Sequence, residues 1–191
     1  MTKLYLAVVL ALIYMSCGQS ALESVPPAIA VSEQYDDGTL WYSGFMQDSV
    51  QTGHWAWFFP NGSKRYEGTY IKGKQHGLWK YYHQDGYLDY EITYHTGIMH
   101  GPIHHYHPSG LKRIKGQYAS GQLEGPYVVY YTEGMAYESG YYHLGMKDST
   151  WTQFYMSGQP RRQGIYKNDT QHGTWTWWHE DGIIANTEIF Q

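Results

Sequence analysis

The sequence predicts an all-β protein, an elongated single-sheet meander of 24-residue β-hairpin repeats. Glycine recurs with an exact period of 24 residues and no insertion, at Gly38, Gly62, Gly86, Gly110, Gly134, Gly158 and Gly182. Aromatic residues make up 18% of the chain, whereas runs of helix-favouring residues are nearly absent after residue 32. Exact repetition with this composition is typical of short strands joined by turns.

Each 24-residue unit carries signals for two turns. The residue before each glycine of the first column is mostly Asp, Asn or Ser, which are short polar residues that enter tight turns. A further column holds Gly73, Gly97, Gly121 and Gly145. The segments between turns, such as residues 55–59 and 66–70, have the length and composition of strands. The unit is therefore strand, turn, strand, turn, which gives about 13 strands at this strand length.

Large residues that recur at fixed positions are predicted to hold the sheet together. One unit crosses two strands, so equivalent rings lie about 9.6 Å apart, and the intervening strand must supply a ring between them. The tyrosine column can do so, and a glycine two places before most of its members leaves room for a neighbouring ring. The structural columns comprise Trp55, Trp79, Trp151, Trp175, Tyr70, Tyr94, Tyr118, Tyr142, Tyr166 and the turn glycines from Gly62 to Gly182.

Another aromatic column begins at Phe58, three places after Trp55. Three is an odd offset, so in a regular strand the two columns would point to opposite faces. Either both faces of the sheet carry aromatic rings, or a bulge near the turn swings the second column round.

Binding is expected at positions that vary from unit to unit. The column Trp57, Tyr81, His105, Val129, Gln153 and Trp177 is aromatic at its ends and more polar in its middle. Large accessible rings favour contact with a partner. We therefore predict a binding surface that includes Trp57, Tyr81, His105 and Trp177.

The N-terminal residues indicate export. Residues 1–16 contain an apolar run from Leu4 to Met15, which is too short to span a bilayer and fits a secretory signal peptide. Ser16 and Cys17 resemble the lipobox of bacterial lipoproteins, which implies a lipid on Cys17, although Tyr14 stands where that family usually has Leu. The alternative is ordinary cleavage after Ser20. Residues 17–34 are interpreted as a lipid-anchored tether, and residues 35–191 as the repeat domain.

Composition and motifs give no reason to expect catalysis, a cofactor or nucleic-acid binding. Charged residues make up only 16% of the chain and its formal charge is -4, so a basic footprint is lacking. His76, His100 and His172 share a column, but such partners lie about 9.6 Å apart and could not share a metal. We expect no catalytic residue, no metal and no cofactor, and hence not an enzyme.

The units "FFPNGSKRYEGTYIKGKQHG" and "YYHQDGYLDYEITYHTGIMHG" resemble the MORN repeat variant, and the resemblance covers residues 35–191. Bacterial proteins of this type are often labelled YwqK-type antitoxins. The resemblance implies an all-β, non-catalytic module that binds proteins or lipids. Ile92 departs from the pattern where it replaces a glycine. The segment "WKYYHQDG" is also similar to choline- and glucan-binding cell-wall repeats, whose units are shorter.

Together these observations predict a non-catalytic lipoprotein of the bacterial envelope whose sheet is a protein-binding scaffold. A YwqK-type antitoxin-like partner of a toxin and an aromatic module that binds cell-wall glycan are the alternatives. The membrane would be contacted through the N-terminal lipid only. The two open edges of the sheet would also allow edge-to-edge self-association.

Overall fold

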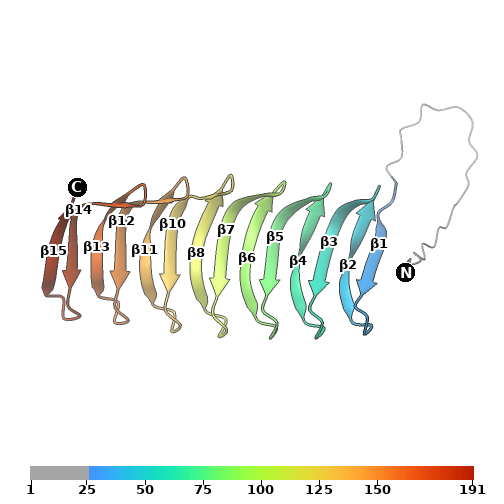
Figure 1. Cartoon of the computed structure of the whole chain (residues 1–191), viewed down its shortest axis with the longest axis horizontal. Coiled ribbons are helices and arrows are strands. Elements are labelled where there is room, and N and C mark those ends of the chain that lie inside the picture. The colour runs from blue at the N-terminus through green and yellow to red at the C-terminus, as the bar shows by residue number, and fades with distance from the viewer. Residues whose placement is uncertain (1–25) are drawn as a thin grey trace, which may run out of the picture.

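The computed structural model describes residues 26–191, which form one antiparallel sheet of fifteen strands (Figure 1). This confirms the predicted all-β hairpin meander. The proposed signal peptide and Cys17 lie outside the described residues. The strands are β1 (Ile29–Gln34), β2 (Leu40–Gln47), β3 (Val50–Phe58), β4 (Lys64–Ile71), β5 (Lys74–Tyr82), β6 (Leu88–His95), β7 (Ile98–Tyr106), β8 (Lys112–Ala119), β9 (Gln122–Leu123), β10 (Gly125–Tyr130), β11 (Ala136–His143), β12 (Met146–Phe154), β13 (Pro160–Lys167), β14 (Thr170–Trp178) and β15 (Ile184–Phe190).

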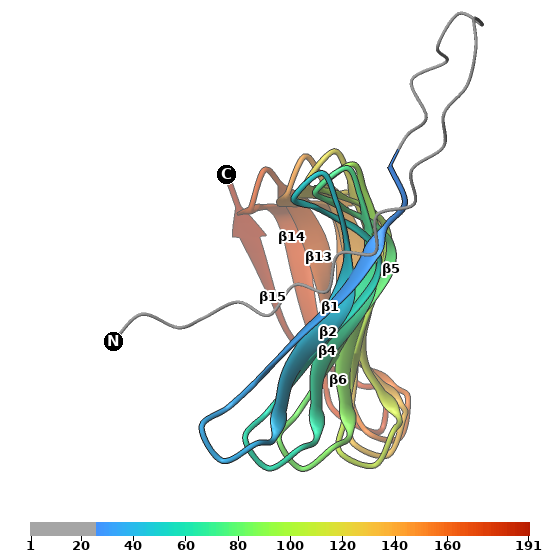
Figure 2. The ribbon, with the colours of Figure 1, turned by 90° about the vertical axis from the view of Figure 1, so that its right-hand side faces the viewer.

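Every strand pairs with its neighbour in the chain, except that β9 pairs only with β8 and β10 then takes the next place in the sheet. Figure 2 looks along the row of strands and shows that the sheet is twisted and curved. Within residues 26–191 there is no helix long and apolar enough to cross a membrane.

The sheet begins earlier in the chain than the sequence predicted. Residues assigned to the tether form β1, which pairs with β2 from Ile29↔Met46 to Gln34↔Leu40. The strand lacks the aromatic pattern of the repeat, but Ile29, Val31 and Glu33 occupy the same register as residues of the later units. Within the described residues, the sheet therefore starts at Ile29 and not at Tyr35. This added strand, with the short β9, accounts for the excess over the expected number.

Two kinds of turn alternate along the chain, and each requires left-handed backbone. Lys72 and Gly73 both have positive φ, 50° and 73°, which defines the two-residue mirror-image turn that matches the twist of a hairpin. At the other edge, Gly86 has φ 91°. Its amide donates to the His83 carbonyl, and the His83 amide donates to the Tyr87 carbonyl. Such a loop is a type I turn followed by a bulge at glycine.

The large buried side chains form one row along the middle of the sheet rather than a thick core. Trp55, Trp79, Trp151 and Trp175 are at most 2% exposed, and each lies over a glycine of the preceding strand. At Gly140 an added Cβ would lie 2.1 Å from Trp151 Cδ2. The Trp151 indole N–H donates to the Tyr141 carbonyl at 3.1 Å. The glycines therefore make room for rings, as their spacing before the tyrosine column predicted.

The departure at Ile92 is matched by a second departure on the neighbouring strand. Ile92 of β6 pairs with Ile103 of β7, and both are buried. Ile103 stands where the other units have a large ring, and Ile92 stands where they have glycine. Two branched aliphatic side chains thus fill the space that a glycine and an indole fill elsewhere.

Candidate interaction surface

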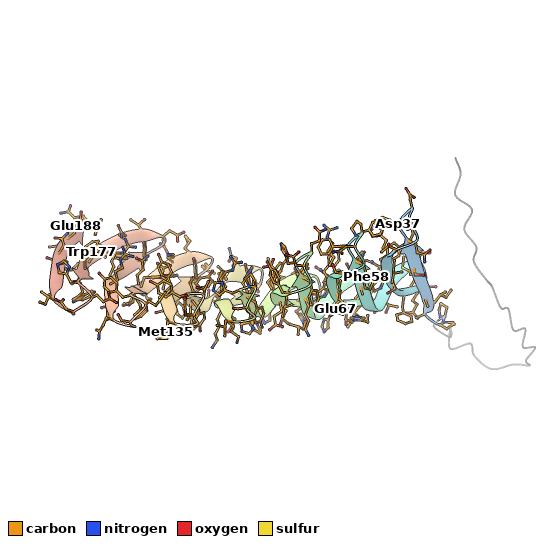
Figure 3. All side chains as sticks on the ribbon, turned by 90° about the horizontal axis from the view of Figure 1, so that it is seen from below. Asp37, Phe58, Glu67, Met135, Trp177 and Glu188 are labelled. Carbon is orange, nitrogen blue, oxygen red and sulfur yellow. The ribbon has the colours of Figure 1, made fainter. Side chains whose placement is uncertain are left out.

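The two faces of the sheet carry different side chains. Alternation along β5 places Trp79 and Tyr81 on one face and Lys80 on the other. We call the first the tryptophan face, which holds Trp55, Trp79, Trp151 and Trp175, and the second the opposite face. Figure 3 shows side chains projecting on both sides along the whole sheet.

Five rings from five consecutive strands form a continuous stack on the tryptophan face. The register pairs each ring with the next, from Trp57 through Tyr66, Tyr81 and Tyr90 to His105. Successive ring centroids lie 4.6, 5.7, 4.3 and 5.0 Å apart, with interplanar angles between 9° and 31°. We call this row the aromatic ladder; its members are Trp57, Tyr66, Tyr81, Tyr90 and His105.

The ladder rests on the buried row beneath it and stays accessible along its outer side. Trp57 lies 5.3 Å from Trp55 and 6.2 Å from Trp79 between ring centroids. All five members of the ladder are partly buried. Because Tyr66, Tyr81 and Tyr90 each stand between two other rings, their faces are covered and their edges point outward. Ring edges carry partial positive charge and favour acceptor groups or apolar contact.

The environment keeps the ladder neutral. Burial raises the pKa of the Tyr81 hydroxyl, and the neighbouring Tyr94 hydroxyl acts in the same direction. Burial likewise raises the pKa values of Tyr66 and Tyr90. Burial lowers the pKa of His105, and the nearby Arg113 lowers it further. The ladder is therefore an uncharged surface at neutral pH.

The structure brings three of the four predicted binding residues together. Trp57, Tyr81 and His105 lie in the ladder, whereas Trp177 lies in β14 near the other end of the same row, 6.3 Å from Trp175 between ring centroids. Tyr66 and Tyr90 complete the ladder and were missed, because they come from the alternate strands and belong to another sequence column. Their spacing, four residues before Tyr70 and Tyr94, was the available signal.

Beyond His105 the same row holds aliphatic, polar and charged residues until it reaches a ring again at Trp177. It continues with Ile114, Val129, Glu138, Gln153, Arg162 and Trp177. Glu138 accepts hydrogen bonds from Lys147 at 3.2 Å and from Gln153 at 3.0 Å. The tryptophan face thus has an aromatic half and a polar half.

On the opposite face, carboxylates accept hydrogen bonds from tyrosines of the column that begins at Phe58. Tyr82 donates to Glu67 at 2.7 Å, and Tyr106 donates to Glu91 at 2.6 Å. Lys64 also lies 2.7 Å from Glu67. Burial tends to raise the pKa of Glu67, but the hydrogen bonds from Lys64 and Tyr82 outweigh it and hold the pKa below its ordinary value.

These contacts answer the question that the odd offset raised: both faces carry aromatic rings. Bulges occur as well, for example between Tyr81 and Tyr82, but they leave Tyr82 opposite to the tryptophan face. The preceding strand offers a glutamate to two of the three tyrosines in this column, whereas Tyr130 has Lys115 at the corresponding position. Phe58 and Phe154 appear where the corresponding residues are Ser43 and Ser139. At Tyr82 and Tyr106 the hydroxyl thus meets a carboxylate that accepts from it.

Histidines gather near the edge formed by the two-residue turns. His95 comes from the strand between His76 and His100, with ring centroids 5.4 Å from the first and 6.4 Å from the second. His95 was overlooked when the histidine columns were considered alone. Even so, residues 26–191 contain no group of three or more His, Cys, Asp or Glu side chains placed to hold a metal ion.

Comparison with known families finds a match for three of the hairpins. Three segments match the MORN repeat variant. They are residues 51–72, 75–95 and 171–191, which correspond to the hairpins β3–β4, β5–β6 and β14–β15. The first two MORN-variant segments contain four of the five ladder rings, and the third contains Trp175 and Trp177. No curated protein matches the chain.

Proposed function

We propose that this chain is a non-catalytic scaffold that binds a protein partner through its tryptophan face. The aromatic ladder carries this proposal. It is a regular row of partly buried rings on a sheet held by neighbouring strands, so the surface is preformed and loses little conformational entropy on binding. Large aromatic side chains with a small loss of rotamer freedom are the residues that concentrate binding energy in protein interfaces.

The ring geometry favours a protein over a glycan. A sugar ring that stacks on an aromatic side chain needs a free ring face, and the interior rings of the ladder are covered on both faces by their neighbours. Edges and hydroxyl groups remain for contact, and these fit peptide carbonyls and apolar side chains. A toxin bound by a YwqK-type antitoxin would be one partner of this class.

We further propose that the scaffold works in the bacterial envelope, held by a lipid on Cys17. The support is the apolar segment Leu4–Met15 followed by Ser16-Cys17. The β1 strand begins at Ile29, so an anchored Cys17 would be joined to the sheet by residues 18–28. That segment would set how far the sheet can stand from the membrane.

A site-specific photo-crosslinking experiment tests the partner proposal in cells. The photoreactive residue p-benzoylphenylalanine replaces Tyr81 in the full chain, and a matched variant carries it at Leu78. Both positions lie in β5, but Leu78 is on the opposite face and 48% exposed. We expect a discrete protein adduct from position 81 that is absent from position 78. Adducts of equal yield from both positions, or none from position 81 in a folded chain, would contradict a protein site on the tryptophan face.

A further inference from the structure

Arg162 is a cation on the tryptophan face that makes no ion pair with an acidic side chain among the described residues. Its guanidinium lies over the Trp175 ring, 4.9 Å from the centroid. Its Nε is buried and has no hydrogen-bond partner among the described residues.

The equivalent residues of the other units do not share this feature. The position is Tyr42, Tyr66 and Tyr90 in the first units and Ile114 in the next. Glu138 follows, and Lys147 and Gln153 satisfy it at 3.2 and 3.0 Å. Arg162 therefore stands out in its row as a charged group without an acidic partner among the described residues.

The neighbours of Arg162 form an amphipathic setting rather than a second charge cluster. In the register of the sheet it is flanked by Gln153 of β12 and Trp177 of β14. Glu138 lies two strands away and is already paired with Lys147. Glu188 of β15 lies opposite Trp175 in the register but makes no ion pair with Arg162.

A guanidinium in such a setting is suited to a carboxylate. Its planar fork donates parallel hydrogen bonds to two carboxylate oxygens, and such charge-assisted pairs are stronger than neutral ones. Stacking on Trp175 fixes the plane of the fork, so little freedom remains to be lost.

We propose that Arg162, with Trp175 and Trp177 beside it, is a binding site for a carboxylate side chain of the protein partner. The site rests on the proposed function and adds the chemistry of one contact. The partner surface would place an Asp or Glu at the polar half of the row, while apolar or carbonyl groups meet the aromatic ladder.

Nuclear magnetic resonance tests the site without knowledge of the partner. The probe is the α-amide of N-acetylglutamate, titrated into the full chain at constant ionic strength while the indole N–H signals of Trp175 and Trp177 are followed. The neutral N-acetylglutamine amide is the matched compound. Arg161→Gln is the matched protein control, because Arg161 is exposed and lies near the Tyr155 ring instead, 5.8 Å from its centroid.

We expect saturable indole shifts with the glutamate compound in the wild type and in Arg161→Gln. The affinity for the glutamate compound should be at least tenfold lower in Arg162→Gln. It should be intermediate in Arg162→Lys, which keeps the charge without the planar fork of the guanidinium. Equal shifts with the glutamine compound, or an unchanged affinity in a folded Arg162→Gln chain, would overturn the proposal. Carboxylate binding without a crosslinked partner at Tyr81 would leave this site standing and refute the scaffold function.

Discussion

The indole of Trp79 occupies the space directly above Gly68, so that an added Cβ on Gly68 would lie 2.2 Å from Trp79 Cδ2. The bulge in β5 makes this approach possible, because residues 77–79 face only Gly68 between the pairs Glu67↔Lys80 and Thr69↔His76. The indole N–H then reaches the Thr69 carbonyl at 3.3 Å. One glycine thus permits both the burial and the hydrogen bond of the ring.

Gly68→Ala should destabilise the sheet by about 2–3 kcal/mol, because the fully buried Trp79 cannot move away from the added methyl group. Urea denaturation followed by tryptophan fluorescence measures the loss. Gly116→Ala is the milder control, since its Cβ would meet the edge of Tyr127 at 2.8 Å.

The natural pair Ile92 and Ile103 suggests a second test of the match between the glycine position and the tryptophan position. Gly68→Ile combined with Trp79→Ile reproduces that pair at another seam of the sheet. The double variant should be more stable than the sum of the single changes predicts, by at least about 1 kcal/mol of coupling. Additive effects would show that the residues at positions 68 and 79 are not energetically coupled.

Thr96→Asn should stabilise the protein by roughly 0.5–1 kcal/mol, because Thr96 is β-branched and sits at a left-handed turn position that asparagine tolerates better. Its φ is 50° in the two-residue turn before Gly97. Thermal unfolding measures the gain. Thr174→Asn is the control at an exposed strand position, where the same change should be neutral or destabilising; a gain there of equal size would contradict the turn argument.

The sheet should unfold at a lower alkaline pH than most globular proteins of ordinary tyrosine content. Burial and the hydrogen bond to Glu91 raise the pKa of Tyr106 to about 12, and burial raises that of Tyr142 to about 12. Tyrosines of the unfolded chain ionise near pH 10. The contribution to stability is therefore complete below about pH 10 and is lost as pH rises through about 12. Tyrosinate absorbance should appear at a higher pH in the native chain than in the urea-unfolded chain. The substitution Tyr106→Phe should reduce this difference in pH.

Tyr82→Phe should cost about 1 kcal/mol at neutral pH, because Glu67 loses a hydrogen bond to its charged form. The pKa of Glu67 is held below its ordinary value, so this contribution is present above about pH 4.5 and disappears as the carboxylate protonates at lower pH. Denaturation at pH 7 and pH 3 measures the difference. Tyr130→Phe is the control, since its hydroxyl has no hydrogen bond to another described residue; an equal loss in both variants would assign the effect to the ring alone.

Cys17→Ala should release the chain from the membrane fraction and abolish an acyl mass increment on a mature chain that starts at residue 17. Intact mass spectrometry and fractionation of both forms measure this. A chain that starts near Ala21 and is unaffected by the substitution would instead place cleavage after Ser20.

The period of the glycines was enough to predict the hairpin meander, because each turn type requires its own glycine position. The sequence could also place the tyrosine between successive tryptophans, as Tyr70 lies 6.1 Å from Trp55 and 5.0 Å from Trp79 between ring centroids. The sequence predicted only part of the aromatic ladder, because Tyr66 and Trp57 meet through strand register and not through a shared column. β1 was missed because a strand without rings gives little signal against a repeat defined by rings.

Repetition alone would leave a sheet free to add units without limit. Glu188 in β15 stands opposite Trp175, the position that glycines such as Gly68 hold opposite Trp55. A further indole could not lie over β15 as Trp79 lies over Gly68, because Glu188 stands at the glycine position, and a charge on the inner side of an edge strand opposes further pairing. Figure 3 labels Glu188 at this end of the ribbon. Within the described residues, the β15 edge is therefore less suited than the β1 edge to pairing with a further strand.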